Sequence, residues 1–100
     1  MSISDARLGQ LGSRFAELEA RLASGTLEGP EFVAASRDYA ELEPVARAAS
    51  EVVMMRDELA SLSALTESDP EMRAMAEEEI ATLKAKLPQA EAGVAYRHAR

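Results

Sequence analysis

The acidic run Glu77–Glu79 and the single histidine, His98, are the side chains of this chain best suited to metal or acid–base chemistry. Metal sites on helices pair a glutamate with a histidine three residues later. Ala95 stands three residues before His98, so this pairing is absent. Consecutive helical residues point about 100° apart, and the three carboxylates therefore cannot all face one ion. We interpret the run as a solvated helix face and assign no catalytic, cofactor-binding or metal-binding residue.

Other catalytic signatures are missing as well. The sequence has no Gly-x-x-x-x-Gly-Lys loop, no Gly-x-Ser-x-Gly elbow and no dinucleotide fingerprint. It has no cysteine, which excludes disulfides, thiolate metal sites and cysteine nucleophiles and fits a reducing compartment. We therefore expect that the chain alone is not an enzyme and needs no cofactor.

Composition favours a small all-α domain. The 100 residues are 47% hydrophobic and 4% aromatic, with 11 basic and 18 acidic side chains and a net charge of −7. Negative charge disfavours binding to phosphate backbones, so no direct reading of nucleic-acid sequence is expected. A membrane helix needs about 20 consecutive apolar residues, which this chain lacks. No secretory signal is visible either, and we expect a cytoplasmic protein.

The first element that must position any site is a helix predicted over residues 3–23. Its apolar residues follow the 3-4-3-4 spacing of a coiled-coil seam: Leu8, Leu11, Phe15, Leu18 and Leu22. Ser4 or Asp5 is suited to cap its start, and Ser24 with Gly25 to end it.

A long second helix is predicted over residues 30–65, with Pro30 at its first position. Its apolar stripe contains Phe32, Ala35, Tyr39, Leu42, Val45, Ala49, Val52, Met55 or Arg56, Leu59 and Leu62. Proline inside a helix removes a hydrogen bond, so a bend is expected near Pro44. Residues 31–68 carry a net charge of −5, which we interpret as a solubilising face; a surface for a basic partner protein is the alternative.

The third helix is predicted over residues 70–87, with Asp69 as its N-cap and Pro88 limiting its end. Its stripe contains Met72, Met75 or Ala76, Ile80, Leu83 and Leu87. We expect Met54, Met55, Met72 and Met75 to fill the core; an adaptable groove for a partner is the alternative. Residues 5–88 would form the domain, and residues 89–100 a weakly ordered tail, because Gly93 interrupts a segment with few large apolar side chains.

Helix length limits the possible shapes. A helix of 36 residues spans roughly 54 Å, whereas a compact domain of this size is about 35 Å across. The short helices can therefore pack antiparallel along different halves of the long one. The prediction is an elongated three-helix antiparallel bundle, coiled-coil-like, with its long middle helix bent near Pro44.

Two segments carry a more specific signal. Residues 68–79 read SDPEMRAMAEEE, and residues 36–45 read SRDYAELEPV. Together they resemble the N-terminal helical domain of bacterial class-I peptide chain release factors, most closely the type that reads UAA and UAG. The motif positions, which would have structural or docking roles, are Arg37, Tyr39, Leu42, Asp69, Pro70, Glu71, Met72 and Arg73.

The resemblance implies a role in translation termination. In the family, this domain projects toward the stalk base of the large ribosomal subunit and influences the release-factor GTPase. Stop-codon reading and peptidyl-tRNA hydrolysis belong to later domains with a Pro-Val-Thr type tripeptide and a Gly-Gly-Gln loop, neither of which occurs here. The chain then acts as a docking module, either as a truncated product or as an excised domain.

A second hypothesis is a stand-alone coiled-coil interaction or scaffold protein with no link to translation. The heptad-like spacing over residues 8–22 favours it, and such a protein would self-associate. An antiparallel bundle within one chain favours the release-factor hypothesis, whereas an obligate dimer of parallel long helices favours the scaffold.

Overall fold

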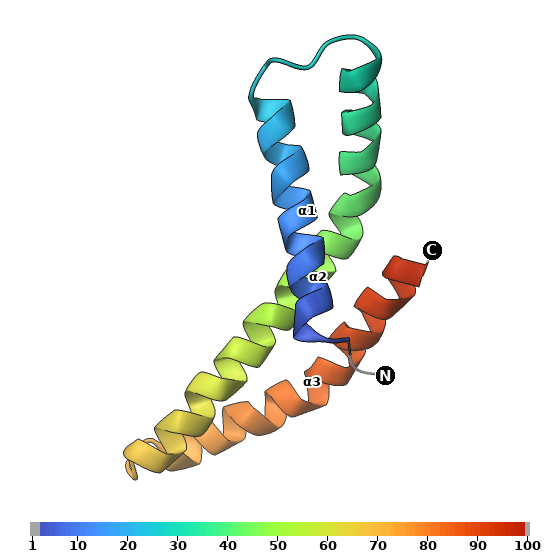
Figure 1. Cartoon of the computed structure of the whole chain (residues 1–100). Helices are drawn as coiled ribbons and strands as arrows, with labels where there is room; N and C mark the ends of the chain where they lie inside the picture. Colours follow the sequence, from blue (N-terminus) through green and yellow to red (C-terminus); the bar gives the residue numbers. More distant parts are fainter. Residues whose placement is uncertain (1–2, 100) are drawn as a thin grey trace.

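Three helices follow one another along the chain: α1 (Asp5–Ala23), α2 (Pro30–Ser68) and α3 (Arg73–Ala99). This computed structural model describes residues 3–99. They form an elongated body with extents of 59 × 27 × 18 Å (Figure 1). The all-α, elongated architecture predicted from the sequence is confirmed. Within the described residues, no helix has an apolar stretch long enough to span a bilayer.

Helix α1 has the boundaries that its flanking residues predict. The Ser4 side chain accepts a hydrogen bond from the backbone N–H of Arg7, with the two atoms 3.1 Å apart. This bond satisfies one of the free N–H groups at the helix start. After Ala23 the chain turns at Gly25, whose φ of 72° is cheap only for glycine.

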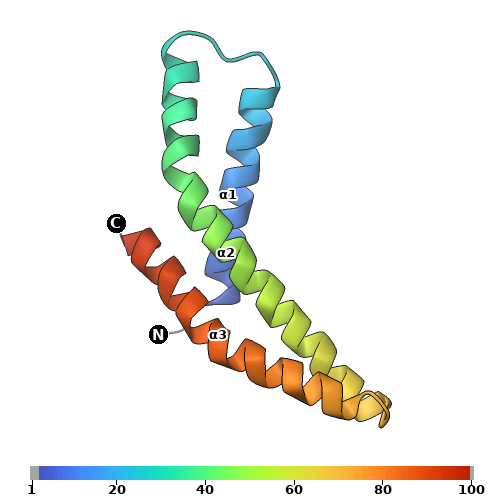
Figure 2. The same ribbon diagram turned by 180° about the vertical axis from the view of Figure 1, so that it is seen from behind.

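Helix α2 runs through Pro44 without interruption but is not straight. Figures 1 and 2 show it changing direction in its green section, between the teal start and the yellow end. The Pro44 ring removes one backbone hydrogen bond and clashes with the carbonyl one turn earlier, which kinks a helix. The predicted bend is confirmed.

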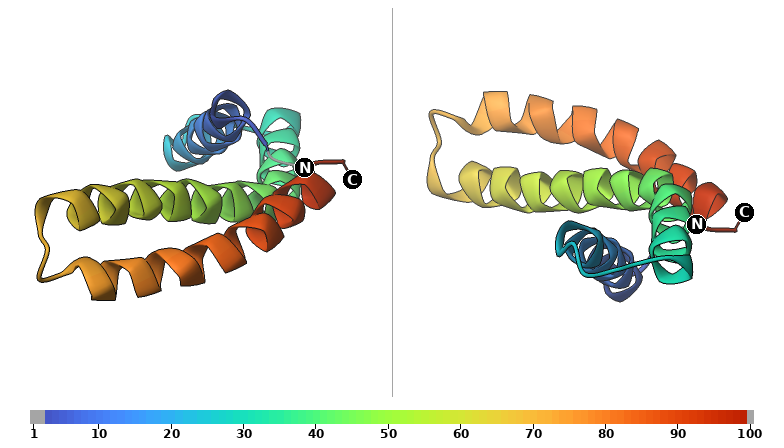
Figure 3. Two further views of the ribbon diagram at one scale, coloured as in Figure 1. Left: turned by 90° about the horizontal axis from the view of Figure 1, so that it is seen from below. Right: turned by 90° about the horizontal axis from the view of Figure 1, so that it is seen from above.

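The three helices form two antiparallel pairs that share α2. Helix α1 packs along the first part of α2 and α3 along the second, and α1 and α3 do not pack on each other. Figure 3 shows α1 and α3 on opposite sides of α2. The short helices therefore occupy different parts of the long one, as the length of α2 requires.

The core lies where the two pairs meet. It consists of Leu8, Leu11, Val45, Ala49, Val52 and Val94. Val52 and Val94 have no exposed surface, and Leu8 is 2% exposed. All three helices thus contribute to one apolar cluster near the middle of the molecule.

The start of α3 differs from the prediction. Residues 70–72 form a turn, and the helix begins at Arg73 instead of Pro70. The Met72 N–H donates to the Asp69 carbonyl at 3.2 Å, which closes this turn. The Asp69 carboxylate accepts from the Glu71 N–H at 3.1 Å, so it supports the turn before the helix.

The predicted end of α3 at residue 87 is wrong, because the helix continues through Pro88 to Ala99. Val94 explains the continuation, since it is fully buried in the core cluster. Burial of a valine side chain contributes about 1.5–3 kcal/mol, which offsets much of the cost of a proline within the helix. Of the residues expected to form a weakly ordered tail, 89–99 are thus described as helix, and residue 100 lies outside the described residues.

Several residues predicted for the core lie on the surface. Met54 is 67% exposed, Met75 57%, Phe32 48% and Met72 36%. Small residues occupy the contact positions nearby, with Ala35 and Ala76 each 2% exposed. Away from the centre each hairpin is only two helices thick, so the long side chains remain outside the contact.

We predict that Val52→Ala lowers the free energy of unfolding by about 2 kcal/mol, because it removes buried methyl groups and leaves a cavity. Val53→Ala is the matched control, since Val53 is adjacent on α2 but 38% exposed, whereas Val52 is fully buried. Urea titration followed by circular dichroism measures both. Equal losses in the two variants would contradict the described core.

Candidate docking surface

The first group of motif residues lies on α2 where α1 packs against it. The Tyr39 ring stacks on Phe15 of α1, with the ring centroids 4.7 Å apart and the planes 23° from parallel. Leu42 is half-buried against the core cluster, and Arg37 is exposed. Tyr39 and Leu42 therefore hold α1 to α2, and Arg37 is the member of this group that is open to a partner.

The environment of Tyr39 keeps its phenol neutral. Desolvation raises the pKa of Tyr39, and the nearby carboxylates of Glu19 and Glu43 raise it further, against a smaller opposing effect of Arg47. An unperturbed tyrosine already titrates near pH 10. Tyr39 thus remains protonated near neutral pH and is suited to packing and not to proton transfer.

The second group of motif residues forms the connection between α2 and α3. Arg73 Nε donates to the backbone carbonyl of Thr66 at 3.1 Å, which satisfies an acceptor near the end of α2. The Asp69 carboxylate supports the turn, as described above. Pro70, Glu71 and Met72 are exposed on its surface. Asp69 and Arg73 thus act on the geometry of the connection.

The structure does not bring the two motif groups together. Tyr39 and Asp69 are separated by 30 residues of α2, which corresponds to about 45 Å along a helix. One group belongs to the α1–α2 hairpin and the other to the far end of the α2–α3 hairpin. The motif therefore marks two separate structural elements.

Arg56 is a residue whose importance the sequence pattern did not reveal. Its guanidinium donates to the Asp5 carboxylate at 2.5 Å, to the Ile3 carbonyl at 2.6 Å and to the Glu91 carboxylate at 2.5 Å. The side chain of Arg56 is 21% exposed and that of Glu91 is 13% exposed. One side chain of α2 thus joins the start of α1 to the last third of α3.

The carboxylates also stabilise the charge of Arg56. The hydrogen bond to Glu91 raises the pKa of Arg56, the bond to Asp5 adds to this effect, and burial opposes it. The sequence contained one signal, because residue 55 or 56 occupies a seam position. Asp5 and Glu91 lie 51 and 35 residues from Arg56, and no local spacing connects them.

Negative charge is concentrated at the end of the α2–α3 hairpin. Residues 57–79, here called the distal segment, contain eight acids and one arginine, a net charge of −7. The rest of the chain has ten acids and ten bases, so the distal segment accounts for the whole net charge. The negative charge assigned to residues 31–68 is thus concentrated at the far end of α2, and it continues into α3.

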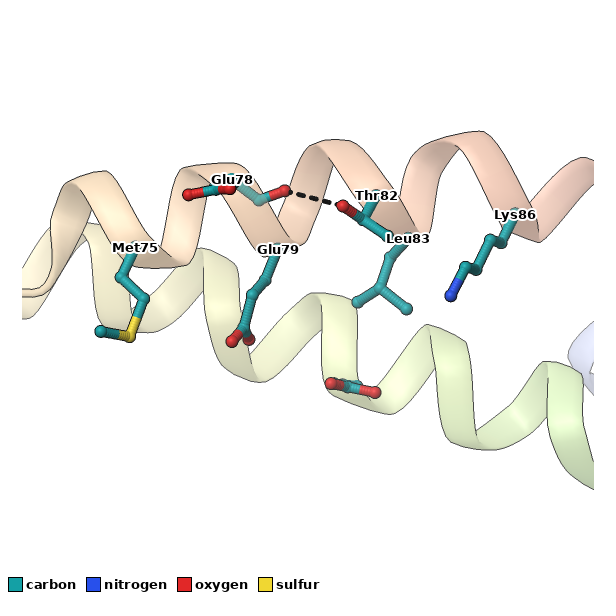
Figure 4. A pocket seen from close by; sticks show the side chains of 7 residues that line it. Met75, Glu78, Glu79, Thr82, Leu83 and Lys86 are labelled. Atoms are coloured by element: carbon teal, nitrogen blue, oxygen red, sulfur yellow. Dashed lines mark hydrogen bonds between the residues drawn. The ribbon is translucent and has the colours of Figure 1, made fainter.

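A hollow lies beside this charge, between α2 and α3. We call it the distal groove, and it is lined by Glu58 of α2 and by Met75, Glu78, Glu79, Thr82, Leu83 and Lys86 of α3. Figure 4 shows Met75, Glu79 and Leu83 directed from α3 toward α2. The Thr82 hydroxyl donates to the Glu78 backbone carbonyl at 3.2 Å, so the Glu78 carboxylate is not used in that bond.

Within the described residues, the surface presents separated charged and apolar side chains. Within residues 3–99, no three His, Cys, Asp or Glu side chains are placed to hold a metal ion. Glu77–Glu79 are exposed on α3, and His98 is exposed near its end. The chemistry of the surface is therefore that of charge and apolar contact, which suits docking.

Comparison with known proteins gives one family match and several relatives with the same name. The PCRF domain family matches residues 11–96. The chain is 69% identical to peptide chain release factor 1 of Novosphingobium aromaticivorans and 60% identical to that of Erythrobacter litoralis, over 91% of this chain and 25% of each relative. It is 45% identical to the same factor of Dinoroseobacter shibae, over 85% of this chain and 24% of the relative.

The chain thus spans about a quarter of the length of the curated relatives that it matches. No solved structure gives a significant match. The resemblance to the N-terminal region of a class-I release factor is confirmed.

We predict that Arg56 and Glu91 are energetically coupled by about 1–3 kcal/mol in a double-mutant cycle with Arg56→Met and Glu91→Gln, because removing one partner leaves the other poorly solvated. The matched control is Arg47 with Glu43, a pair at 3.2 Å whose side chains are 72% and 37% exposed. An exposed pair of this kind contributes below about 0.5 kcal/mol. Urea titration of all variants measures both couplings, and similar values for the two pairs would contradict a joining role for Arg56.

Proposed function

Because this chain belongs to the PCRF domain family, we propose that it is the N-terminal docking module of a class-I peptide chain release factor. The observation that carries the proposal is the match over residues 11–96, together with relatives that are release factors. Its partners would be the stalk base of the large ribosomal subunit and the release-factor GTPase. Its place of action would be the cytoplasm.

Docking by this module would rest on surface contact between preformed shapes. The core cluster and the Arg56 contacts hold the two hairpins together at the middle of the molecule. A preorganised surface loses little conformational entropy on binding. The rigid body can therefore present an exposed Arg37 on one hairpin and the acidic distal segment on the other.

The chain alone would not release peptides. It contains no Gly-Gly-Gln sequence and covers about a quarter of the relatives' length. We assign stop-codon reading and hydrolysis to the parts of the relatives that this chain does not match. The whole factor's activity is then the product of other domains that this module helps to place on the ribosome.

The scaffold hypothesis has less support. It was based on the apolar seam of residues 8–22. Leu8, Leu11 and Leu18 of that seam are already buried within this chain. A seam buried within one chain does not need a second copy. The release-factor relatives match 91% of this chain, which supports the release-factor hypothesis instead.

Ribosome pelleting and a peptide-release assay test this proposal. We predict that the chain sediments with ribosomes and by itself releases no peptide at a stop codon. Added in excess, it changes the rate at which the release-factor GTPase recycles a full-length factor. Competition for a shared docking position is the physical reason. Leu8→Asp with Val52→Asp is the control, since two charges in the core unfold the module and abolish the effect.

Two outcomes would count against the proposal. Stop-codon-dependent peptide release by the chain alone would refute the proposal that hydrolysis requires other domains. Absence of ribosome sedimentation, together with no effect on the recycling rate, would refute docking.

A further inference from the structure

The distal groove combines apolar surface with negative charge. Met75 is 57% exposed within it, and Leu83 lies at its floor with 9% exposure. An exposed methionine beside a leucine is an adaptable apolar contact, and methionine is enriched at protein interfaces. The groove thus places apolar contact surface beside the charged side chains of the distal segment.

The charges of the groove surround that apolar surface. Glu58 lies on the α2 side, Glu78 and Glu79 lie on α3, and Lys86 lies farther along α3 toward the centre of the molecule (Figure 4). The lining thus contains three carboxylates and one ammonium group, and the distal segment adds to the same field with its net charge of −7. A partner must therefore be basic around an apolar strip, with an acid tolerated at the end that meets Lys86.

The dimensions of the groove suit a short helix. Met75 and Lys86 are eleven residues apart on α3, which corresponds to about 17 Å, or three turns of a partner helix. The hollow has a volume of about 480 Å³. Met75, Glu79 and Leu83 follow one another at four-residue spacing, so the contact side chains form one stripe along α3.

We propose that the distal groove binds a basic amphipathic helix of about three turns from a partner protein. Leucine-like side chains of that helix contact Met75 and Leu83, and its lysines or arginines face Glu58, Glu78 and Glu79. This inference deepens the proposed docking function by giving the partner's chemistry, and it rests on that function for the partner's place on the ribosome.

Charge excludes a nucleic acid as the occupant. Binding of RNA to proteins is driven by cations that neutralise phosphates, whereas the distal segment has a single arginine among eight acids. A second copy of the chain docked through the same face would bring an equally acidic surface to the groove. A basic protein segment is the occupant that this field attracts.

A stapled 14-residue peptide tests the groove directly. The probe has leucines at positions i, i+4 and i+7 and lysines elsewhere, and binding is measured by fluorescence anisotropy at 50 and 200 mM salt. The groove variant Glu58→Gln/Met75→Ser/Glu79→Gln weakens binding at least about tenfold, because it removes both charge and apolar contact. Higher salt weakens peptide binding to the parent chain more than peptide binding to the groove variant.

The matched control variant is Glu28→Gln/Glu31→Gln/Val33→Ser. It makes the same change in charge and a similar but smaller change in apolar surface at exposed positions of the other hairpin, where Val33 is 54% exposed. We expect its affinity to stay within about twofold of the parent. Equal weakening of peptide binding by both variants would overturn the proposal, because it would indicate general attraction to an acidic chain. A probe with serine in place of leucine that binds as tightly as the leucine probe would also overturn it.

Photo-crosslinking to purified ribosomes separates this inference from the proposed function. A photoreactive residue at position 75 is expected to crosslink to a protein, and one at position 33 is the control. Crosslinks from position 75 to ribosomal RNA alone would overturn the groove proposal while leaving ribosome docking intact. Binding of the probe peptide by a chain that does not sediment with ribosomes would instead refute the docking function and support the groove.

Discussion

The contact between Arg56 and its acceptors at Ile3, Asp5 and Glu91 determines how the hairpins are joined. Helices α1 and α3 lie on opposite sides of α2 and do not pack on each other. Their relative position therefore depends on the side chains of α2 that contact both helices. A partly desolvated guanidinium is costly unless its donors are satisfied. Hydrogen bonds to Ile3, Asp5 and Glu91 satisfy its donors beside the apolar cluster and so favour the arrangement in which all three acceptors meet.

Because the junction of the two hairpins is fixed, the uneven distribution of charge has a defined direction. The bend of α2 and the Arg56 contacts set the direction of both hairpins, and the distal segment then carries the net charge of −7 to one end of a 59 Å body. Charge placed at the end of a rigid arm orients a molecule during its approach to a partner. The same charge spread over a flexible chain would provide solubility without direction.

Local signals and tertiary contacts explain which features the sequence predicts. Helix α1 was predicted to within two residues because its cap at Ser4, its seam and the turn at Gly25 all agree. The end of α3 was missed because Pro88 and Gly93 are local breakers that the burial of Val94 outweighs. The 4-3-4 spacing of Leu83, Leu87, Ala90 and Val94 was the available signal. The Arg56 contacts join residues 35 and 51 positions apart, which periodicity does not relate.

Several residues that identify the family support the fold, whereas the residues that line the distal groove are other ones. Tyr39 stacks between helices, and Asp69 and Arg73 support the connection between α2 and α3. Such roles constrain a fold in any partner context. Glu58, Met75 and Glu79 line the distal groove and give it its charge and its apolar strip. The motif thus reveals which fold the chain adopts, and under our proposal the choice of partner resides in the neighbouring distal groove.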